Sequence, residues 1–249
     1  MCTDISCRNY LCRRFGGGME IKMLYIIDTA NIEKIRHCIE YFPIAGVTTN
    51  PTIISKEHTD FIKLIKEIEN IIGNNRMFHI QLTGDTADKM IKEAKALRDI
   101  IGDNLYVKIP ISEEGLKATM KLHSEGFHIT ETAIFTQQQA LMAAMAGADF
   151  VAPYVNRLDN IISDGVNVVS EIVELFTKYN LKAKVLAASF KTAEQVHKIS
   201  MVGGHAVTVN PDILDGLIYH PLTMYAIDDF KADWESVYGK KTILDMMKE

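Results

Sequence analysis

Short apolar runs alternate with longer stretches whose apolar residues recur every three or four positions, from Leu24 to about residue 220. Short runs of this kind are typical of buried strands, and the longer periodicity is typical of helices that bury one face. The pattern predicts eight strands, at Leu24–Ile27, Ala45–Thr48, Met77–Leu82, Leu105–Ile109, Phe127–Ala133, Phe150–Pro153, Ala183–Ala188 and Ala206–Val209. It predicts helices at Asn31–Tyr41, Lys56–Ile72, Thr86–Ile101, Glu113–Ser124, Thr136–Ala146, Ile161–Tyr179, Thr192–Met201 and Pro211–Tyr219.

Strands that alternate with helices predict a parallel sheet, because parallel neighbours need a crossover connection. Eight strand–helix units fit a closed α/β barrel, so residues 23–220 are expected to form a single (β/α)₈ TIM barrel. The alternative is an open, doubly wound sheet. Its usual G-x-G-x-x-G motif is missing after the first strand, where Asp28-Thr29-Ala30-Asn31 stands instead.

Both ends of the chain differ from this repeat. Residues 221–249, with Trp234, predict one additional amphipathic C-terminal helix that covers an end of the barrel or packs on a neighbouring subunit. Residues 1–22 carry Arg13, Arg14 and three consecutive glycines before a second methionine. We interpret this segment as a tag or an upstream extension, with a basic partner-binding peptide as the alternative.

Composition narrows the class of protein. Hydrophobic residues make up 47% and charged residues 24% of the chain, and its net charge is −5. Such values fit a globular protein, and a mildly acidic chain without a basic run is not expected to bind nucleic acid. Apolar stretches long enough for a membrane span, or a secretory leader, are missing from the pattern.

The four cysteines are unevenly placed, at Cys2, Cys7, Cys12 and Cys38. A disulfide framework distributes its cysteines through the fold, and a zinc site pairs them two to four residues apart. Reduced thiols in a cytoplasmic protein are therefore expected.

Polar residues stand at the predicted carboxyl ends of seven strands. In a TIM barrel these ends meet at one rim, where active sites lie. The residues are Asp28, Thr48, Asn50, Gln81, Lys108, Thr132, Tyr154, Arg157 and Ser189.

Lys108 is the sharpest candidate, because it lies inside the apolar strand Leu105–Ile109. Lysine is almost never fully buried without a partner, and burial lowers the pKa of its ammonium group. A neutral amine attacks a ketone and forms an imine, which accepts electrons during C–C cleavage. The alternative is a salt-bridged lysine that orients an acid such as Asp28.

The other rim residues each have a structural alternative. Asp28 either handles protons or caps the first helix. Asn50-Pro51 is a common turn dipeptide, and Thr48 and Thr132 are equally compatible with caps or turns. Gln81 is a buried amide that needs partners, whereas Tyr154 is compatible with an ordinary core aromatic.

Arg157 and Ser189 predict a phosphate site. The guanidinium fork binds phosphate, and barrels often hold phosphate with the loops after their last strands. The alternative for Arg157 is a surface ion pair with Asp159 or Asp164. We expect no metal, because the histidines form no H-x₃-H pair and His79 has no carboxylate beside it in the sequence. We also expect no cofactor.

At these residues the chain resembles a known family, the small transaldolases and fructose-6-phosphate aldolases. The resemblance runs from about Leu24 to the C-terminal helix. Five segments carry it: LYIIDTANI at 24–32, FPIAGVTTNPTII at 42–54, YVKIPISEEGLKA at 106–118, AGADFVAPYVNRLDN at 146–160 and AKVLAASFKT at 183–192.

The resemblance implies a (β/α)₈ barrel with a Schiff-base lysine at Lys108 and no cofactor. It implies Asp28 as a polar partner of the substrate and Thr48 and Asn50 as residues that line the site. Arg157 and Ser189 match the family's phosphate-binding positions. The family also forms rings of identical subunits in which the C-terminal helix packs across to a neighbour, so a ring-shaped homo-oligomer is expected.

Two positions separate the branches of this family. Transaldolases have Glu at the position of Gln81 and Phe at that of Tyr154, whereas the aldolase branch has Gln and Tyr, which with Thr132 hold a proton-transfer water. This chain has Gln81, Tyr154 and Thr132, and Ala152 where transaldolases often have Ser. The resemblance thus implies an aldolase that cleaves fructose 6-phosphate reversibly to dihydroxyacetone and glyceraldehyde 3-phosphate. The alternatives are a transaldolase and a barrel that binds sugar phosphates without catalysis.

Overall fold

The computed structural model describes residues 23–247 and contains a closed barrel of eight parallel strands in sequence order. This arrangement confirms the predicted (β/α)₈ TIM barrel. The strands are β1 (Leu24–Asp28), β2 (Ile44–Thr48), β3 (Met77–Gln81), β4 (Leu105–Pro110), β5 (His128–Ile134), β6 (Phe150–Pro153), β7 (Lys184–Ala187) and β8 (Ala206–Val209).

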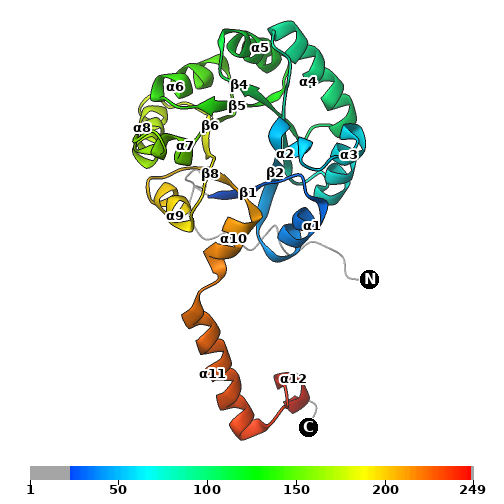
Figure 1. Cartoon of the computed structure of the whole chain (residues 1–249), viewed down its shortest axis with the longest axis vertical. Helices are drawn as coiled ribbons and strands as arrows, with labels where there is room; N and C mark the ends of the chain where they lie inside the picture. The colour runs from blue at the N-terminus through cyan, green and yellow to red at the C-terminus, as the bar shows by residue number, and fades with distance from the viewer. Residues whose placement is uncertain (1–22, 248–249) are drawn as a thin grey trace.

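Helices surround the barrel as a ring, which Figure 1 shows nearly end on. They are α1 (Ile32–Tyr41), α2 (Pro51–Ser55), α3 (Phe61–Ile72), α4 (Ala87–Ile101), α5 (Glu113–Ser124), α6 (Gln137–Ala146), α7 (Val155–Asp159), α8 (Gly165–Lys178), α9 (Ala193–Met201) and α10 (Pro211–Ile218). Most begin at a side-chain cap, such as Asn31 on α1 or Thr136 on α6, so the sequence marks their starts.

Two short helices were not predicted. The expected helix at Lys56–Ile72 is wrong at its start, because α2 occupies Pro51–Ser55 and α3 begins only at Phe61. Asn50-Pro51 is a helix start rather than a turn, since the Asn50 side chain accepts from the Ile53 amide at 3.0 Å. Similarly, α7 follows β6 directly at Val155. Both helices stand at the carboxyl ends of strands, beside the barrel mouth.

Apolar side chains form two separate cores. The larger fills the layer between the barrel and its helices, around residues such as Ile80, Val107 and Ile129. The smaller lies inside the barrel and contains Ile26, Phe150, Leu186 and Ala206. Strand residues alternate between the two because successive side chains point to opposite faces of a sheet. The interior positions nearest the mouth are left to polar residues.

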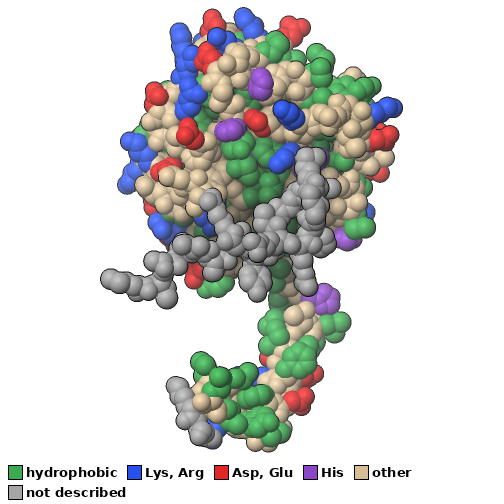
Figure 2. Space-filling model, turned by 180° about the vertical axis from the view of Figure 1, so that it is seen from behind, with side chains coloured by type: hydrophobic (Ala, Val, Ile, Leu, Met, Phe, Trp, Pro, Cys, Tyr) green, Lys and Arg blue, Asp and Glu red, His purple; other side chains and the backbone are tan. Residues whose placement is uncertain are grey.

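The C-terminal segment extends away from the barrel. It contains α11 (Pro221–Tyr238), which confirms the predicted additional C-terminal helix. This helix does not continue over all of residues 221–249, because the short α12 (Ile243–Met246) follows it as a separate element. Gly239 ends α11 at a positive φ of 62°, a conformation in which glycine is favoured. Figures 1 and 2 show this segment projecting from the barrel, with hydrophobic side chains along it.

Some expectations lie outside residues 23–247. The interpretation of residues 1–22 as a tag, and with it Cys2, Cys7 and Cys12, falls on residues that the structure does not describe. Cys38 is buried as a free thiol. None of the helices described between residues 23 and 247 is long and apolar enough to cross a membrane.

Candidate active site

Lys108 projects into the barrel from β4. Its side chain is 5% exposed, and its Nζ donates a hydrogen bond of 3.0 Å to the carbonyl oxygen of Thr49. Burial lowers the pKa of the Lys108 ammonium group, and the carboxylate of Asp28 partly opposes this. A lysine in this position has a neutral amine more readily available than one on the surface.

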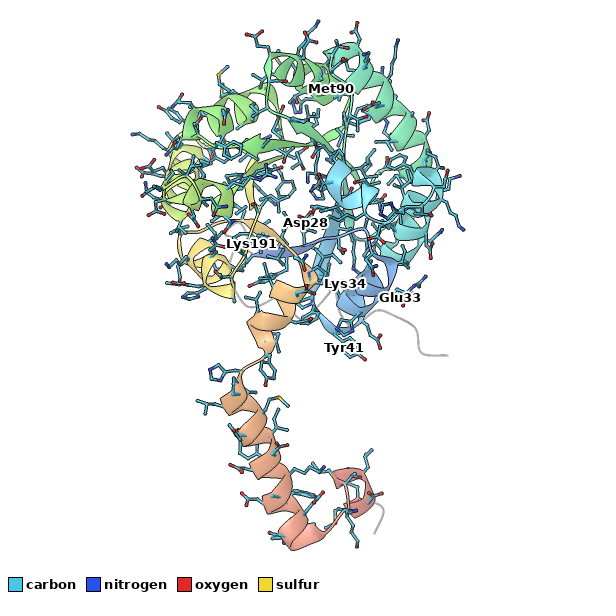
Figure 3. The ribbon with its side chains drawn as sticks, viewed as in Figure 1. Asp28, Glu33, Lys34, Tyr41, Met90 and Lys191 are labelled. Atoms are coloured by element: carbon cyan, nitrogen blue, oxygen red, sulfur yellow. The ribbon has the colours of Figure 1, made fainter. Side chains whose placement is uncertain are left out.

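Asp28 ends β1 and lies at the centre of the barrel in Figure 3. Its Oδ1 accepts a hydrogen bond of 2.7 Å from the Thr48 hydroxyl, which also contacts the Thr208 hydroxyl. Burial raises the pKa of the Asp28 carboxyl, while the Lys108 ammonium and the Thr48 hydroxyl lower it. Asn31, not Asp28, caps α1, so the structural alternative for Asp28 is wrong.

Gln81 lies on β3 and Thr132 on β5, the two strands that flank β4, and Tyr154 directly follows β6. Gln81 is the direct partner of Lys108 in the β3–β4 register. Thr132 pairs with Ala152 on β6, and its hydroxyl lies 3.1 Å from the Tyr154 hydroxyl. The structure therefore brings Thr132 and Tyr154 together.

Directly after Thr132, strand β5 contains a β-bulge. Ala133 has a positive φ of 59°, and the β5–β6 register shifts between Thr132 and Ile134. The Tyr154 amide then donates to the Ile134 carbonyl at 3.1 Å. A bulge of this kind redirects side chains and is frequent beside active sites.

Ser189 follows β7 in a conformation that non-glycine residues rarely adopt, with φ of 63°. Its carbonyl accepts a hydrogen bond of 2.8 Å from the Asn156 amide, at the start of α7. This bond joins the loop that carries Ser189 to the helix that carries Arg157. Strained residues of this kind cluster at ligand sites.

Arg157 is exposed, and its Cζ lies 4.8 Å from the centroid of the Tyr154 ring. Within residues 23–247, Arg157 forms no ion pair with Asp159 or Asp164, which was the structural alternative for this residue. Asp159 instead accepts a hydrogen bond of 2.6 Å from the side-chain amide of Gln195. Asp164 caps α8 through the Asn167 amide at 2.9 Å. Arg157 is thus available to an anion.

Asn50 is the rim residue with the clearest structural role, because its side chain caps α2. It is half-buried beside the mouth, so a substrate contact is compatible with the cap. Its neighbour Thr49, which the sequence analysis passed over, supplies the carbonyl that holds Lys108.

Two further interior residues, Thr130 and Thr208, were not singled out from the sequence, and His79 was only expected not to bind a metal. His79 is fully buried, and its Nδ1 lies 2.9 Å from the Thr130 hydroxyl, next to Lys108 in the β4–β5 register. Thr208 contacts Thr48. The period-2 alternation of β3, β5 and β8 places all three inside the barrel, but one sequence does not separate them from ordinary strand residues.

An apolar cavity of about 430 Å³ lies beside the site, between α2, α3 and α4. Its wall includes Ile54, Phe61, Leu97 and Gln81. No group of three or more potential metal-ligating side chains occurs in the described part of the chain.

The arrangement combines a buried amine, a carboxyl group beside it and two pairs of hydroxyl groups, Thr48 with Thr208 and Thr132 with Tyr154. An amine of lowered pKa is suited to attack on a carbonyl, and the nearby carboxyl and hydroxyl groups are suited to proton transfer. The guanidinium of Arg157 lies next to Tyr154 and forms no ion pair within residues 23–247. The chemistry that this supports is imine formation with a carbonyl compound that carries an anionic group.

A family model and individual relatives both place this chain in the same protein family. The family model described as "Transaldolase/Fructose-6-phosphate aldolase" matches residues 25–247. A "Probable fructose-6-phosphate aldolase" from Streptococcus pneumoniae is 37% identical over 222 residues, which cover 89% of this chain and 100% of that protein. A "Probable transaldolase" from Lachnoclostridium phytofermentans is 39% identical over 218 residues, covering 88% of this chain and 100% of the relative.

Solved structures support the fold alone. A mutant flavocytochrome b2 with bound pyruvate aligns with a TM-score of 0.56 at 13% identity, covering 76% of this chain and 57% of its own. This chain thus spans little more than half the length of that protein. At such low identity the likeness extends to the barrel and not to the chemistry.

Proposed function

Because the chain belongs to the transaldolase/fructose-6-phosphate aldolase family, it is an enzyme of the aldolase/transaldolase type, and we propose that it is a class I aldolase. Its substrate is fructose 6-phosphate, cleaved reversibly to dihydroxyacetone and glyceraldehyde 3-phosphate. The observation that carries this proposal is the burial of Lys108 inside the barrel, beside Asp28.

In the proposed mechanism the neutral Lys108 amine adds to the ketone carbon of the open-chain sugar. Loss of water gives an iminium ion, with Asp28 as the proton carrier for this step. The C3–C4 bond then breaks, its electron pair moves into the iminium, and the C4 hydroxyl loses its proton. Glyceraldehyde 3-phosphate leaves, and an enamine of dihydroxyacetone stays on Lys108.

A water held by Gln81, Thr132 and Tyr154 returns a proton to the enamine. Hydrolysis of the resulting iminium frees dihydroxyacetone and regenerates the amine. The 3.1 Å contact between the hydroxyls of Thr132 and Tyr154 supports a shared site for that water. Thr48, Asn50 and Ala152 line the pocket around the bound ketone.

The phosphate of the substrate binds between Arg157 and Ser189. The guanidinium is exposed and the carboxylates nearest to it in sequence are engaged elsewhere, so it retains its donors for an anion. The bond from the Asn156 amide to the Ser189 carbonyl keeps the two binding residues on adjoining segments.

A transaldolase is the second candidate function. Relatives that are 39% and 40% identical carry the name "Probable transaldolase", the second of them from a Thermoanaerobacter species. A transaldolase keeps the enamine on Lys108 and passes it to another aldose phosphate. Tyr154 and Gln81 favour the aldolase, because they are the residues that support reprotonation.

The deciding experiment measures cleavage of fructose 6-phosphate with no acceptor sugar, and again with erythrose 4-phosphate. An aldolase releases free dihydroxyacetone in both cases. Strict dependence on erythrose 4-phosphate would replace the aldolase assignment by a transaldolase. The activity is expected to survive EDTA, since a protonated imine accepts the electrons without a metal.

We also propose a ring-shaped homo-oligomer that is held together by the C-terminal segment. No residue of α11 is buried, and Leu222, Tyr225, Phe230 and Val237 are each 67–71% exposed. An exposed apolar face of this size on one helix is typical of an interface. The apolar cavity between α2, α3 and α4 is a suitable acceptor on the neighbouring copy.

Sedimentation tests this assembly. The full chain is expected to sediment as an oligomer, and a chain that ends at residue 220 as a smaller species. A monomeric full chain would refute the assembly. A cytoplasmic location is likewise a prediction, to be checked by cell fractionation.

A further inference from the structure

One guanidinium group links two parts of the proposed site. The Arg157 Cζ lies 4.8 Å from the Tyr154 ring centroid, and the Tyr154 hydroxyl lies 3.1 Å from the Thr132 hydroxyl. A residue assigned to the phosphate is therefore in contact with a residue assigned to proton transfer. Nothing in the phosphate-binding role requires this contact.

The Tyr154 ring is half-buried and lies between two groups. The Phe135 ring meets it edge-on, with centroids 5.6 Å apart, and Arg157 stacks on it. Phe135 comes from the end of β5 and is held by the barrel, whereas Arg157 is a long, exposed side chain. The position of the ring thus depends on a group that has many rotamers until something fixes it.

A bound phosphate is the group that fixes Arg157. Guanidinium and phosphate form paired, charge-assisted hydrogen bonds that define the plane of the guanidinium. The Ser189 carbonyl is bonded to the Asn156 amide, so the second phosphate residue adjoins the turn that carries Arg157.

We propose that phosphate binding accelerates proton transfer at the Lys108-bound substrate, because it locks Arg157 against the Tyr154 ring and thereby holds the Tyr154 hydroxyl at Thr132. The inference rests on the proposed function and adds to it a positioning role for Arg157. In this way, binding energy from the phosphate end of the substrate, which does not react, lowers the barrier to proton transfer at the reacting carbon. A displaced proton-transfer group slows its step strongly, so the effect is on rate as well as on affinity.

The half-reaction of dihydroxyacetone isolates this step, since dihydroxyacetone carries no phosphate. Lys108 forms the iminium, the adjacent C–H bond breaks, and its proton passes to the water held by Tyr154. The electron pair of that bond forms the enamine. In D₂O a deuteron returns to the carbon, and NMR measures the exchange. Phosphite dianion serves as the probe for the empty phosphate site.

For the wild-type protein, saturating phosphite is expected to raise the exchange rate by about 10-fold or more, with the roughly 10²–10⁴-fold contribution of an oriented proton-transfer group as the upper limit. Arg157→Lys keeps the charge but loses the planar stack. The Arg157→Lys protein is expected to bind phosphite, which a rise in its melting temperature reports. Phosphite is not expected to raise its exchange rate. Tyr154→Phe keeps the ring and loses the hydroxyl. Its exchange rate is expected to be low and to stay the same when phosphite is added.

Arg98→Lys is the matched control. Arg98 stacks on Phe127 at 3.6 Å, away from the mouth and on the outer face of the barrel, so this variant is expected to retain the full phosphite response. Borohydride trapping on the same samples reports the Lys108 imine separately. An absent adduct would overturn the proposed function, and this inference with it. An adduct with exchange that phosphite does not change, or full acceleration in Arg157→Lys or Tyr154→Phe, would overturn the inference alone.

Discussion

Two buried ionisable side chains stand on neighbouring strands and face opposite ways. Lys108 on β4 points into the barrel, while Glu131 on β5 points outward toward α5. Glu131 is fully buried, its Oε1 accepts from the Thr119 hydroxyl at 2.6 Å, and its Oε2 has no hydrogen-bond partner among residues 23–247. Burial disfavours the charged form of both groups.

The two groups have different surroundings, so a shifted pKa has a different consequence for each of them. Lys108 has a carboxyl group, a carbonyl and the polar barrel mouth near it, which fits the proposed attack of its amine on a substrate. Glu131 lies in the closed layer between barrel and helix, beside one hydroxyl. Burial and a shifted pKa therefore do not identify a catalytic residue until the face of the strand is known.

The largest effect is expected for Lys108→Met. Because the amine is the proposed nucleophile, turnover is expected to fall more than about 10³-fold, and the borohydride adduct with dihydroxyacetone to disappear. The folded state is expected to keep its stability, since an apolar side chain of similar length replaces a buried amine. Peptide mass spectrometry and thermal melts check both points. An active Lys108→Met protein would contradict the mechanism.

The next largest effect concerns the polar groups around Lys108. Tyr154→Phe is expected to leave imine formation largely intact and to slow the release of free dihydroxyacetone by roughly 10²-fold. The longer-lived enamine then meets an added aldose phosphate, so the ratio of aldolase to transaldolase activity falls. Gln81→Glu in the same chain is expected to lower this ratio further. Equal loss of both activities would make Tyr154 a packing or binding residue.

Glu131→Gln is expected to change stability and not turnover. Burial raises the pKa of Glu131 to about 7 from 4.5 in the unfolded chain. The neutral carboxyl thus contributes stability below pH 4.5, and that contribution is lost as the pH rises through about 7.

A difference of about 2.5 between these pKa values corresponds to about 3 kcal/mol at pH 8. Glutamine carries no charge to lose, so urea unfolding at pH 5 and pH 8 is expected to show a smaller decline for the variant. An unchanged pH dependence would mean that Glu131 is not the group responsible. A large loss of turnover would instead place Glu131 in the catalytic machinery.

The smallest expected effect is that of Thr119→Val. It removes the hydroxyl that donates to Glu131 and costs about 1–2 kcal/mol in unfolding free energy, more at pH 8 than at pH 5. Thr119→Ser keeps the donor and serves as the control. A Thr119→Val protein as stable as wild type at both values of pH would show that the hydrogen bond contributes little.

Much of the candidate site was predictable because a TIM barrel gathers its strand ends at one rim. Lys108, Asp28 and Thr48 were placed from the strand pattern alone, and the structure brings them to the same interior. The boundaries of α2 and α7 were not predicted, since five-residue helices are too short to show a period. The family resemblance added the roles of Gln81 and Tyr154, which remain predictions.

The sequence by itself determined the eight-fold alternation of strands and helices and the face of each strand residue, because these follow from short-range periodicity. The order of the strands in the sheet was decided by closure of the barrel. Only the tertiary structure decided which polar groups meet. Thr48 with Thr208, His79 with Thr130, and Arg157 with Tyr154 are contacts of this kind. Closure of the barrel places β8 beside β1 and lets side chains reach across it, and no local pattern encodes such distances.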